Sequence, residues 1–251
     1  MSRVNTSGSE LNLVTAVSVD ATSAFCIACW VKLERVTETG QFPLALNDVA
    51  VASLPGFPGT HGLDFFWNIG GESSRVRDWT PSSVNRAAID TTGQITNNTW
   101  YPWVFNGSST DVDQYFGSLS NTGDAFGLQV DTNIVSLIVG GGGFLASDEM
   151  VGKIAHVCGW EGNLSGAEVT AFLGGADPNT LTSPTEQWFY YPLTTTSLTN
   201  QWSHSSWTAG TLAGDMTFDG ADNPAVGSGL ILAGTNRGLV NTPLVDGGLI
   251  T

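Results

Sequence analysis

Residues that commonly carry catalysis are sparse in this sequence, and their spacing matches no catalytic motif. Hydrolysis by a nucleophilic triad needs a Ser or Cys, a His and an acid that converge in space. His61, His156 and His204 are lone histidines, and no G-x-S-x-G motif occurs. Glycoside hydrolysis needs two carboxylates around the scissile bond. We therefore predict that the protein is not an enzyme.

Two carboxylate pairs are closest to a catalytic arrangement, but both read better as solvated side chains. Asp148 and Glu149 are adjacent, so in an extended chain they point to opposite faces. Asp111 and Asp113 fall in an expected loop after the Asn106-Gly107 turn. No His/Cys cluster has the spacing of zinc ligands. We expect no cofactor that takes part in chemistry.

The charge of the chain excludes some partners. The net charge is −15, and only eight residues are Lys or Arg. A nucleic-acid backbone or an anionic membrane attracts clustered basic residues, which are missing here. No apolar run reaches the 18 or so residues of a membrane helix, and the N-terminus lacks the apolar run of a signal peptide. We expect synthesis in the cytoplasm, with no nucleic-acid and no membrane partner.

The three cysteines fit a reducing compartment. Cys26 and Cys29 are three positions apart in an expected strand, so their side chains lie on opposite faces and should not form a disulfide. With Cys158, they are interpreted as small buried hydrophobic residues.

Nine Trp and twelve Phe residues are many for this length. We expect most of them in the core, because large aromatic side chains dominate burial energetics. Trp67 and Trp79 are candidates for stacking on a sugar ring. The alternative for both is burial or packing against a turn.

Short alternating segments predict an all-β fold. Each holds β-branched and aromatic residues and is bounded by turn residues. Glu72–Asn85 is expected to be a polar loop, and Asn106-Gly107 and Asp131–Asn133 are expected hairpin turns. A slip is possible near Thr15. The expected strands are Leu11–Val19, Phe25–Leu33, Phe42–Leu46, Val49–Leu54, Leu63–Ile69, Thr99–Phe105, Gln114–Leu119, Phe126–Val130, Ile134–Val139, Met150–Trp160 and Glu186–Leu193.

One short α-helix is predicted near residues 165–174. Ser165 and Glu168 form a capping-box pattern, and Leu164 and Val169 are placed for a hydrophobic staple. Gly174-Gly175 then ends the helix. Because nearly all other segments read as strands, the helix should pack on a sheet.

The same region carries a family resemblance. The run GKIAHVCGW–EGNLSGAEVTAFLGGADP, followed by QWFYYPL, resembles the C-terminal part of the concanavalin A-like, laminin-G-like jelly-roll superfamily. FCIACWVKL at Phe25–Leu33 is similar to its early core strand, and NTWYPWV at Asn98–Val104 to its central strand. The His and basic residues usual after that Trp are absent. The resemblance spans Leu11–Leu193 and implies a two-sheet antiparallel jelly-roll sandwich.

For function the resemblance implies several classes, since this fold serves lectins, glycosidases, adhesion modules and viral coat proteins. The E-x-D-x-x-E pattern of its glycosidases is missing here. Relatives of this fold often bind Ca²⁺ through loop carboxylates. A structural Ca²⁺ is therefore an alternative at the loop aspartates Asp111, Asp113, Asp124 and Asp131.

We expect three parts in the chain. Residues 1–10 form an N-terminal arm, residues 11–202 the jelly-roll domain, and residues 203–251 an extended Gly-rich C-terminal arm. Alone, such an arm buries little apolar surface. We expect it to be held by its own sheets or by neighbouring chains. Its candidate assembly contacts are Trp207, Phe218, Leu230, Leu232, Leu239 and Leu249.

Two functions follow from these features. The first is a structural protein of a bacteriophage virion (capsid decoration, head fibre or tail-associated), made in the host cytoplasm and located in the virion. The composition resembles such proteins in being rich in Gly, Thr, Asn and Trp and poor in Lys. Its partners would be a major capsid or tail protein, or copies of itself. The alternative is a lectin-like module that binds cell-surface glycans of the host.

Overall fold

The computed structural model describes most of the chain between residues 2 and 226. The described residues are 2–5, 10–20, 24–34, 41–47, 62–68, 73–79, 83–108, 110–124, 131–139, 150, 152–194, 200–202, 211–213, 217–219, 222–224 and 226.

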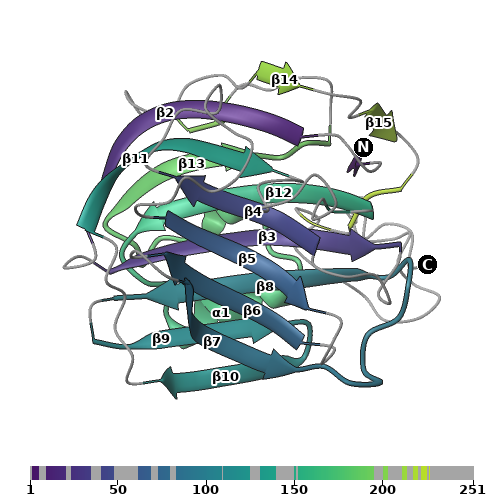
Figure 1. Ribbon diagram of the computed structural model, residues 1–251, viewed down its shortest axis with the longest axis horizontal. Helices are drawn as coiled ribbons and strands as arrows, with labels where there is room; N and C mark the ends of the chain where they lie inside the picture. Colours follow the sequence, from purple (N-terminus) through teal and green to yellow (C-terminus); the bar gives the residue numbers. More distant parts are fainter. Residues whose placement is uncertain are drawn as a thin grey trace, which may run out of the picture.

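The described strands form two antiparallel sheets packed face to face (Figure 1). The eight-stranded sheet has the order β10 (Leu119–Asp124), β9 (Val112–Phe116), β8 (Trp100–Gly107), β3 (Phe25–Leu33), β12 (Gly152–Glu161), β1 (Ser2–Asn5) and β15 (Thr217–Asp219), with β13 (Glu186–Tyr191) also paired to β12. The seven-stranded sheet has the order β14 (Thr211–Ala213), β2 (Glu10–Asp20), β11 (Asp131–Val139), β4 (Gln41–Asn47), β5 (Gly62–Asn68), β6 (Ser73–Trp79) and β7 (Ser83–Asp90). The all-β jelly-roll sandwich is thus confirmed.

Alternation along β3 separates two cores. Phe25, Ile27 and Cys29 point between the sheets, where they join Phe65 and Trp103 in the main core. Cys26, Ala28 and Trp30 point to the opposite, outer face and form a second cluster with residues of helix α1 (Gly166–Leu173). Cys26 and Cys29 therefore lie on opposite faces and are free thiols, as expected. Burial raises the pKa of both thiols.

Helix α1 begins where the sequence pattern predicts. The side chain of Ser165 accepts a hydrogen bond from the Glu168 N–H, and the Glu168 carboxylate accepts one from the Ser165 N–H at 3.1 Å. Val169 and Phe172 are the buried residues of the helix. They cover the outer face of the eight-stranded sheet, so α1 forms a third layer behind both sheets in Figure 1.

Two irregularities interrupt the pairing. The slip predicted near Thr15 is confirmed, because Ile134 pairs with Val17 while Ser136 pairs with Val14. A second bulge in β12 lies at His156, whose φ is 50°. There the neighbour of β12 changes, since residues 152–154 pair with β1 and residues 157–161 pair with β13.

Some expected elements differ from the structure. The loop expected at Glu72–Asn85 instead holds strand β6 and the first residues of β7, which pair with each other because Val76 and Ile89 anchor one face in the core. The hairpin expected at Asp131–Asn133 is wrong: these residues pair with β2 as the start of β11. The strands expected at 49–54 and 126–130 lie outside the described residues.

The described parts of the two terminal segments pair with the sheets. Residues 2–5 form β1, which pairs with β12 and β15. Strand β14 pairs with β2, and both β14 and β15 lie at the same end of the sandwich (Figure 1). The described part of the segment 203–226 therefore packs on its own domain, because its strands complete the hydrogen bonding of sheet edges. Residues 227–251 lie outside the described residues.

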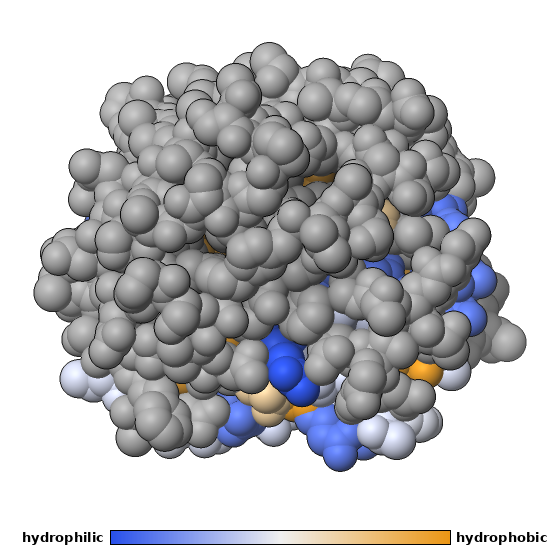
Figure 2. All heavy atoms as spheres, in the orientation of Figure 1, coloured by the Kyte–Doolittle hydropathy of each residue, from blue (hydrophilic) through white to orange (hydrophobic). Residues whose placement is uncertain are grey.

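No helix among the described residues is long and apolar enough to cross a membrane. The described atoms on the face shown in Figure 2 are mainly hydrophilic, with apolar atoms only in small separate spots.

Candidate functional site

A solvent-open depression lies where the chain leaves α1 and enters β13. Its volume is 440 Å³. Thr182, Thr185, Glu186 and Gln187 contribute exposed polar side chains. Leu181, Pro184 and Trp202 complete the lining. Hydroxyl, amide, carboxylate and indole groups together can hydrogen-bond a sugar and contact its apolar face.

Glu168 shapes the loop that lines this depression. One carboxylate oxygen, Oε1, accepts hydrogen bonds from the backbone N–H groups of Thr182 and Ser183 at 2.6 and 2.7 Å. The other oxygen caps the helix at Ser165. Partial burial opposes ionisation, but the hydrogen bonds from Ser183, Thr182 and Ser165 outweigh it and lower the pKa of Glu168 to about 2. The loop is therefore tied to the helix start by one ionised group.

Trp202 is fixed from two directions. Its indole N–H donates to Asn179 Oδ1 at 2.7 Å, and its backbone N–H donates to Asn200 Oδ1 at 3.0 Å. Its ring packs on Trp160 and Tyr190, with centroids 5.2 and 5.4 Å away. Because only 7% of Trp202 is exposed, it supplies the wall of the depression rather than an open stacking platform.

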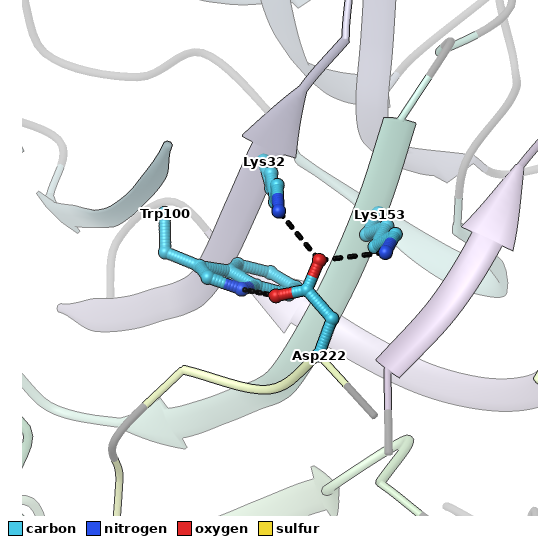
Figure 3. Close-up of polar contacts among 4 residues, drawn as sticks. All are labelled: Lys32, Trp100, Lys153 and Asp222. Atoms are coloured by element: carbon cyan, nitrogen blue, oxygen red, sulfur yellow. Dashed lines mark hydrogen bonds and ion pairs between the residues drawn. The ribbon is translucent and has the colours of Figure 1, made fainter. Parts of the chain in front are cut away.

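A second polar cluster lies on the outer face of the same sheet. Asp222 Oδ2 is 2.5 Å from Lys32 Nζ and 2.6 Å from Lys153 Nζ, and Oδ1 accepts a hydrogen bond from Trp100 Nε1 at 3.0 Å. Figure 3 shows the three donors converging on this one carboxylate. Burial opposes its ionisation, but the bonds from Lys153, Lys32 and Trp100 hold the pKa of Asp222 well below its usual value.

The residues expected to stack on glycans do not form a common site. Trp67 is only 1% exposed and lies in the core between the sheets, with its ring centroid 5.5 Å from that of Phe116. The prediction for Trp67 is therefore wrong, because alternation in β5 points it inward with Leu63 and Phe65. Trp79 ends β6, and its side chain lies outside what the structure describes.

The candidate assembly contacts stay predictions. Phe218 lies in β15, where its backbone pairs with Arg3 of β1, and its side chain is outside the described set. Trp207, Leu230, Leu232, Leu239 and Leu249 lie outside the described residues.

The expected calcium ligands are spread over three strands and a turn. Asp111 precedes β9 and Asp113 lies in it, while Asp124 ends β10 and Asp131 begins β11. Asp113 Oδ1 accepts a hydrogen bond from the Gly123 N–H at 2.8 Å. The described residues contain no group of three or more His, Cys, Asp or Glu side chains that could hold a metal. Calcium at these positions stays a prediction.

Of the three histidines, the structure describes His156. Its Nδ1 lies 2.8 Å from the Tyr190 hydroxyl, and the side chain is buried. Burial lowers the pKa of His156 to about 4. This histidine packs in the wall of the sandwich, while His61 and His204 lie outside the described residues.

Sequence reasoning missed the residues of both sites. The stretch TSPTEQ before the closing strand is rich in hydroxyl groups, which is a usable signal for a polar loop. Nothing local, however, connects Trp202 with Thr182, or Asp222 with Lys32.

The sequence matches the family model of the concanavalin A-like lectin/glucanases superfamily over residues 5–170. The chain therefore belongs to this superfamily. None of the curated proteins compared with the chain matches it.

Solved structures with this fold have low sequence identity to the chain. A candidate carbohydrate-binding protein from Bacteroides ovatus aligns with a TM-score of 0.54 at 12% identity, covering 86% of this chain and 59% of that one. The heptameric SAP-like pentraxin of Limulus polyphemus aligns with a TM-score of 0.51 at 13% identity, covering 68% and 81%. Tailspike protein 2 of Escherichia coli O157:H7 bacteriophage CAB120 reaches 0.47 at 12% identity, covering 70% and 24%, which carries no inference for this chain.

Proposed function

We propose that this protein is a non-enzymatic, lectin-like module that binds glycans at the depression beside β13. The observation that carries this proposal is the lining of that depression. Four exposed polar side chains line it together with the ring of Trp202. Carbohydrate binding is ascribed to the Bacteroides ovatus protein of the same fold. The packing of β14 and β15 on their own domain also favours a self-contained module.

A glycan array probed with the whole folded chain tests the proposal. We expect saturable binding to at least one class of glycan. The double variant Glu186→Ala/Gln187→Ala should weaken that binding at least tenfold, because it removes the hydrogen-bonding groups of the exposed rim. Ser118→Ala is the matched control, since Ser118 is an exposed turn residue between β9 and β10, far along the sheet from β13. Absence of binding at millimolar sugar overturns the proposal.

The proposal also excludes turnover of the bound glycan. Glu186 of the depression pairs in register with Glu161 across β12 and β13, so two glutamates are neighbours on adjacent strands. A glycosidase needs one of its two carboxyl groups to be protonated as an acid. Release of reducing ends from a bound polysaccharide, lost in Glu161→Gln, would replace our proposal by an enzymatic one.

A second proposal is a structural role at the surface of a bacteriophage virion, through contacts with a capsid or tail protein or with other copies of the chain. It rests on the acidic, Lys-poor composition. Both roles are compatible, since a virion surface protein can also hold host glycans. Co-purification of the chain with assembled particles, checked by mass spectrometry, tests it.

A further inference from the structure

Three hydrogen-bond donors stand in one row across the eight-stranded sheet, and sheet register alone aligns them. Lys153 of β12 pairs with Lys32 of β3, which in turn pairs with Trp100 of β8. Lys32 follows Ala28 and Trp30 on the outer face, where Trp100 also packs. The sandwich therefore positions these donors without help from the C-terminal segment.

This row needs an anion. Like charges directly opposite each other on neighbouring strands repel. The side chains of Lys32 and Lys153 are only 13% and 10% exposed, so water screens that repulsion poorly. A carboxylate with one oxygen between the ammonium groups and the other on the indole N–H satisfies all three donors, as Asp222 does in Figure 3.

The outer face near this row is also rich in donors. Trp30 lies two residues before Lys32 on the same strand. Its indole N–H is buried and has no hydrogen-bond acceptor among the described residues. Around Asp222 itself, two ammonium groups and the indole N–H of Trp100 form a set of donors that can recognise a carboxylate on a small organic acid.

Asp222 reaches this row from a weakly attached part of the chain. It follows β14 and β15, which are three-residue strands at sheet edges. Short edge elements open at low free-energy cost compared with core strands. The side chain of Asp222 is 30% exposed, so the cluster borders solvent.

We propose that Lys32, Lys153 and the indole N–H of Trp100 form a carboxylate-binding site, and that Asp222 occupies it as an internal, displaceable ligand. The site is separate from the depression at residues 181–187, so it does not depend on glycan binding there. Its external ligands are carboxylates, either of a small acid or of an acidic sugar. Because Asp222 is part of the same chain, its high effective concentration keeps free carboxylates out of the unmodified protein.

The test removes the internal ligand and adds a carboxylate at constant ionic strength, with chloride as the reference salt. The indole ¹⁵N–¹H resonance of Trp100, assigned with Trp100→Phe, reports binding. We expect Asp222→Ala to bind acetate saturably, with an apparent Kd at least tenfold lower than in the unmodified chain. Asn223→Ala, a change at the exposed neighbouring residue, is the matched control and should behave like the unmodified chain. Adding Lys32→Met to Asp222→Ala should abolish saturation.

Asp222→Asn covers the case in which Asp222→Ala does not fold, because a neutral amide keeps the shape and is a weaker ligand for two ammonium groups. Absence of a saturable shift in the folded variant overturns the proposal, and so does equal binding by the variant and the unmodified chain.

A comparison of glucuronate with acetate distinguishes the two sources of the carboxylate. A Kd at least tenfold below that of acetate identifies an acidic sugar as the ligand, and equal values identify the bare carboxylate of a small acid; either supports the site.

Discussion

His156 sits at the bulge of β12 with a left-handed backbone, where non-glycine residues are uncommon. Its N–H donates to the Pro192 carbonyl at 2.9 Å, and its Nδ1 is paired with the Tyr190 hydroxyl. Burial penalises the charged imidazolium, which lowers the pKa of His156 to about 4 although the carboxylate of Asp177 opposes this. The neutral ring is thus part of the folded structure.

This pKa predicts how stability depends on pH. The unfolded chain takes up the proton near pH 6.5, whereas the folded protein takes it up only near pH 4. The contribution of the neutral ring is therefore complete above pH 6.5 and is lost as the pH falls toward 4, at up to about 1.4 kcal/mol per pH unit. Urea unfolding from pH 7 to 4 should show this loss, and His156→Asn, which tolerates a left-handed backbone, should reduce it. An NMR pKa of His156 near 6.5 would contradict the argument.

At the scale of elements, β12 depends on a glycine for its contact with β13. A Cβ on Gly159 would lie 2.5 Å from the Phe189 ring and 3.0 Å from the Cδ1 atom of Ile27. Gly166 begins α1, and a Cβ there would meet nothing within 4 Å. The same substitution should therefore have opposite effects at the two positions.

We expect Gly159→Ala to lower the free energy of unfolding by about 1–3 kcal/mol through overpacking. Gly166→Ala should raise it by about 0.5 kcal/mol, because alanine restricts the unfolded chain and favours helix. Urea denaturation monitored by tryptophan fluorescence measures both. Equal stability of the two variants would mean that β12 and β13 separate more easily than their packing indicates.

For the whole molecule, the C-terminal segment completes both sheets. Strand β14 covers the edge of β2, β15 covers the edge of β1, and Asp222 forms ion pairs with two largely buried lysines. Free sheet edges pair with other chains. This segment should therefore add to stability and limit association through the sheet edges.

A chain that ends at Trp202 should lose about 1.5–3 kcal/mol of unfolding free energy, because Lys32, Lys153 and Trp100 lose their charge-assisted hydrogen bonds to Asp222. It should also associate through the uncovered edges. A chain that ends at Val226 keeps β14, β15 and Asp222 and serves as the control. Light scattering after size-exclusion chromatography and urea denaturation measure the two effects. If the chain ending at Trp202 is monomeric and equally stable, residues 203–226 do not stabilise the sandwich, and the prediction is wrong.

The sequence by itself determined the features that depend on local chemistry. The alternation of Phe25–Leu33 separated Cys26 from Cys29, and the Ser165–Glu168 pattern started the helix at its observed residue, because side-chain period and capping act within a few residues. The slip expected near Thr15 in the segment Leu11–Val19 also came from the side-chain alternation, and the bulge in the pairing of β2 with β11 lies there.

Only the tertiary structure decided which distant residues meet. Asp222 lies 190 positions from Lys32, and Trp202 borders a loop that begins some twenty residues earlier in the chain, near Thr182. The tertiary structure also decided the role of Trp67. Its hydrophobic ring could pack in a core or stack on a sugar, and only the packing of the two sheets shows that it lies in the core. Register between strands, and not any local pattern, sets these contacts, because each strand's partner is chosen by burial over the whole sandwich.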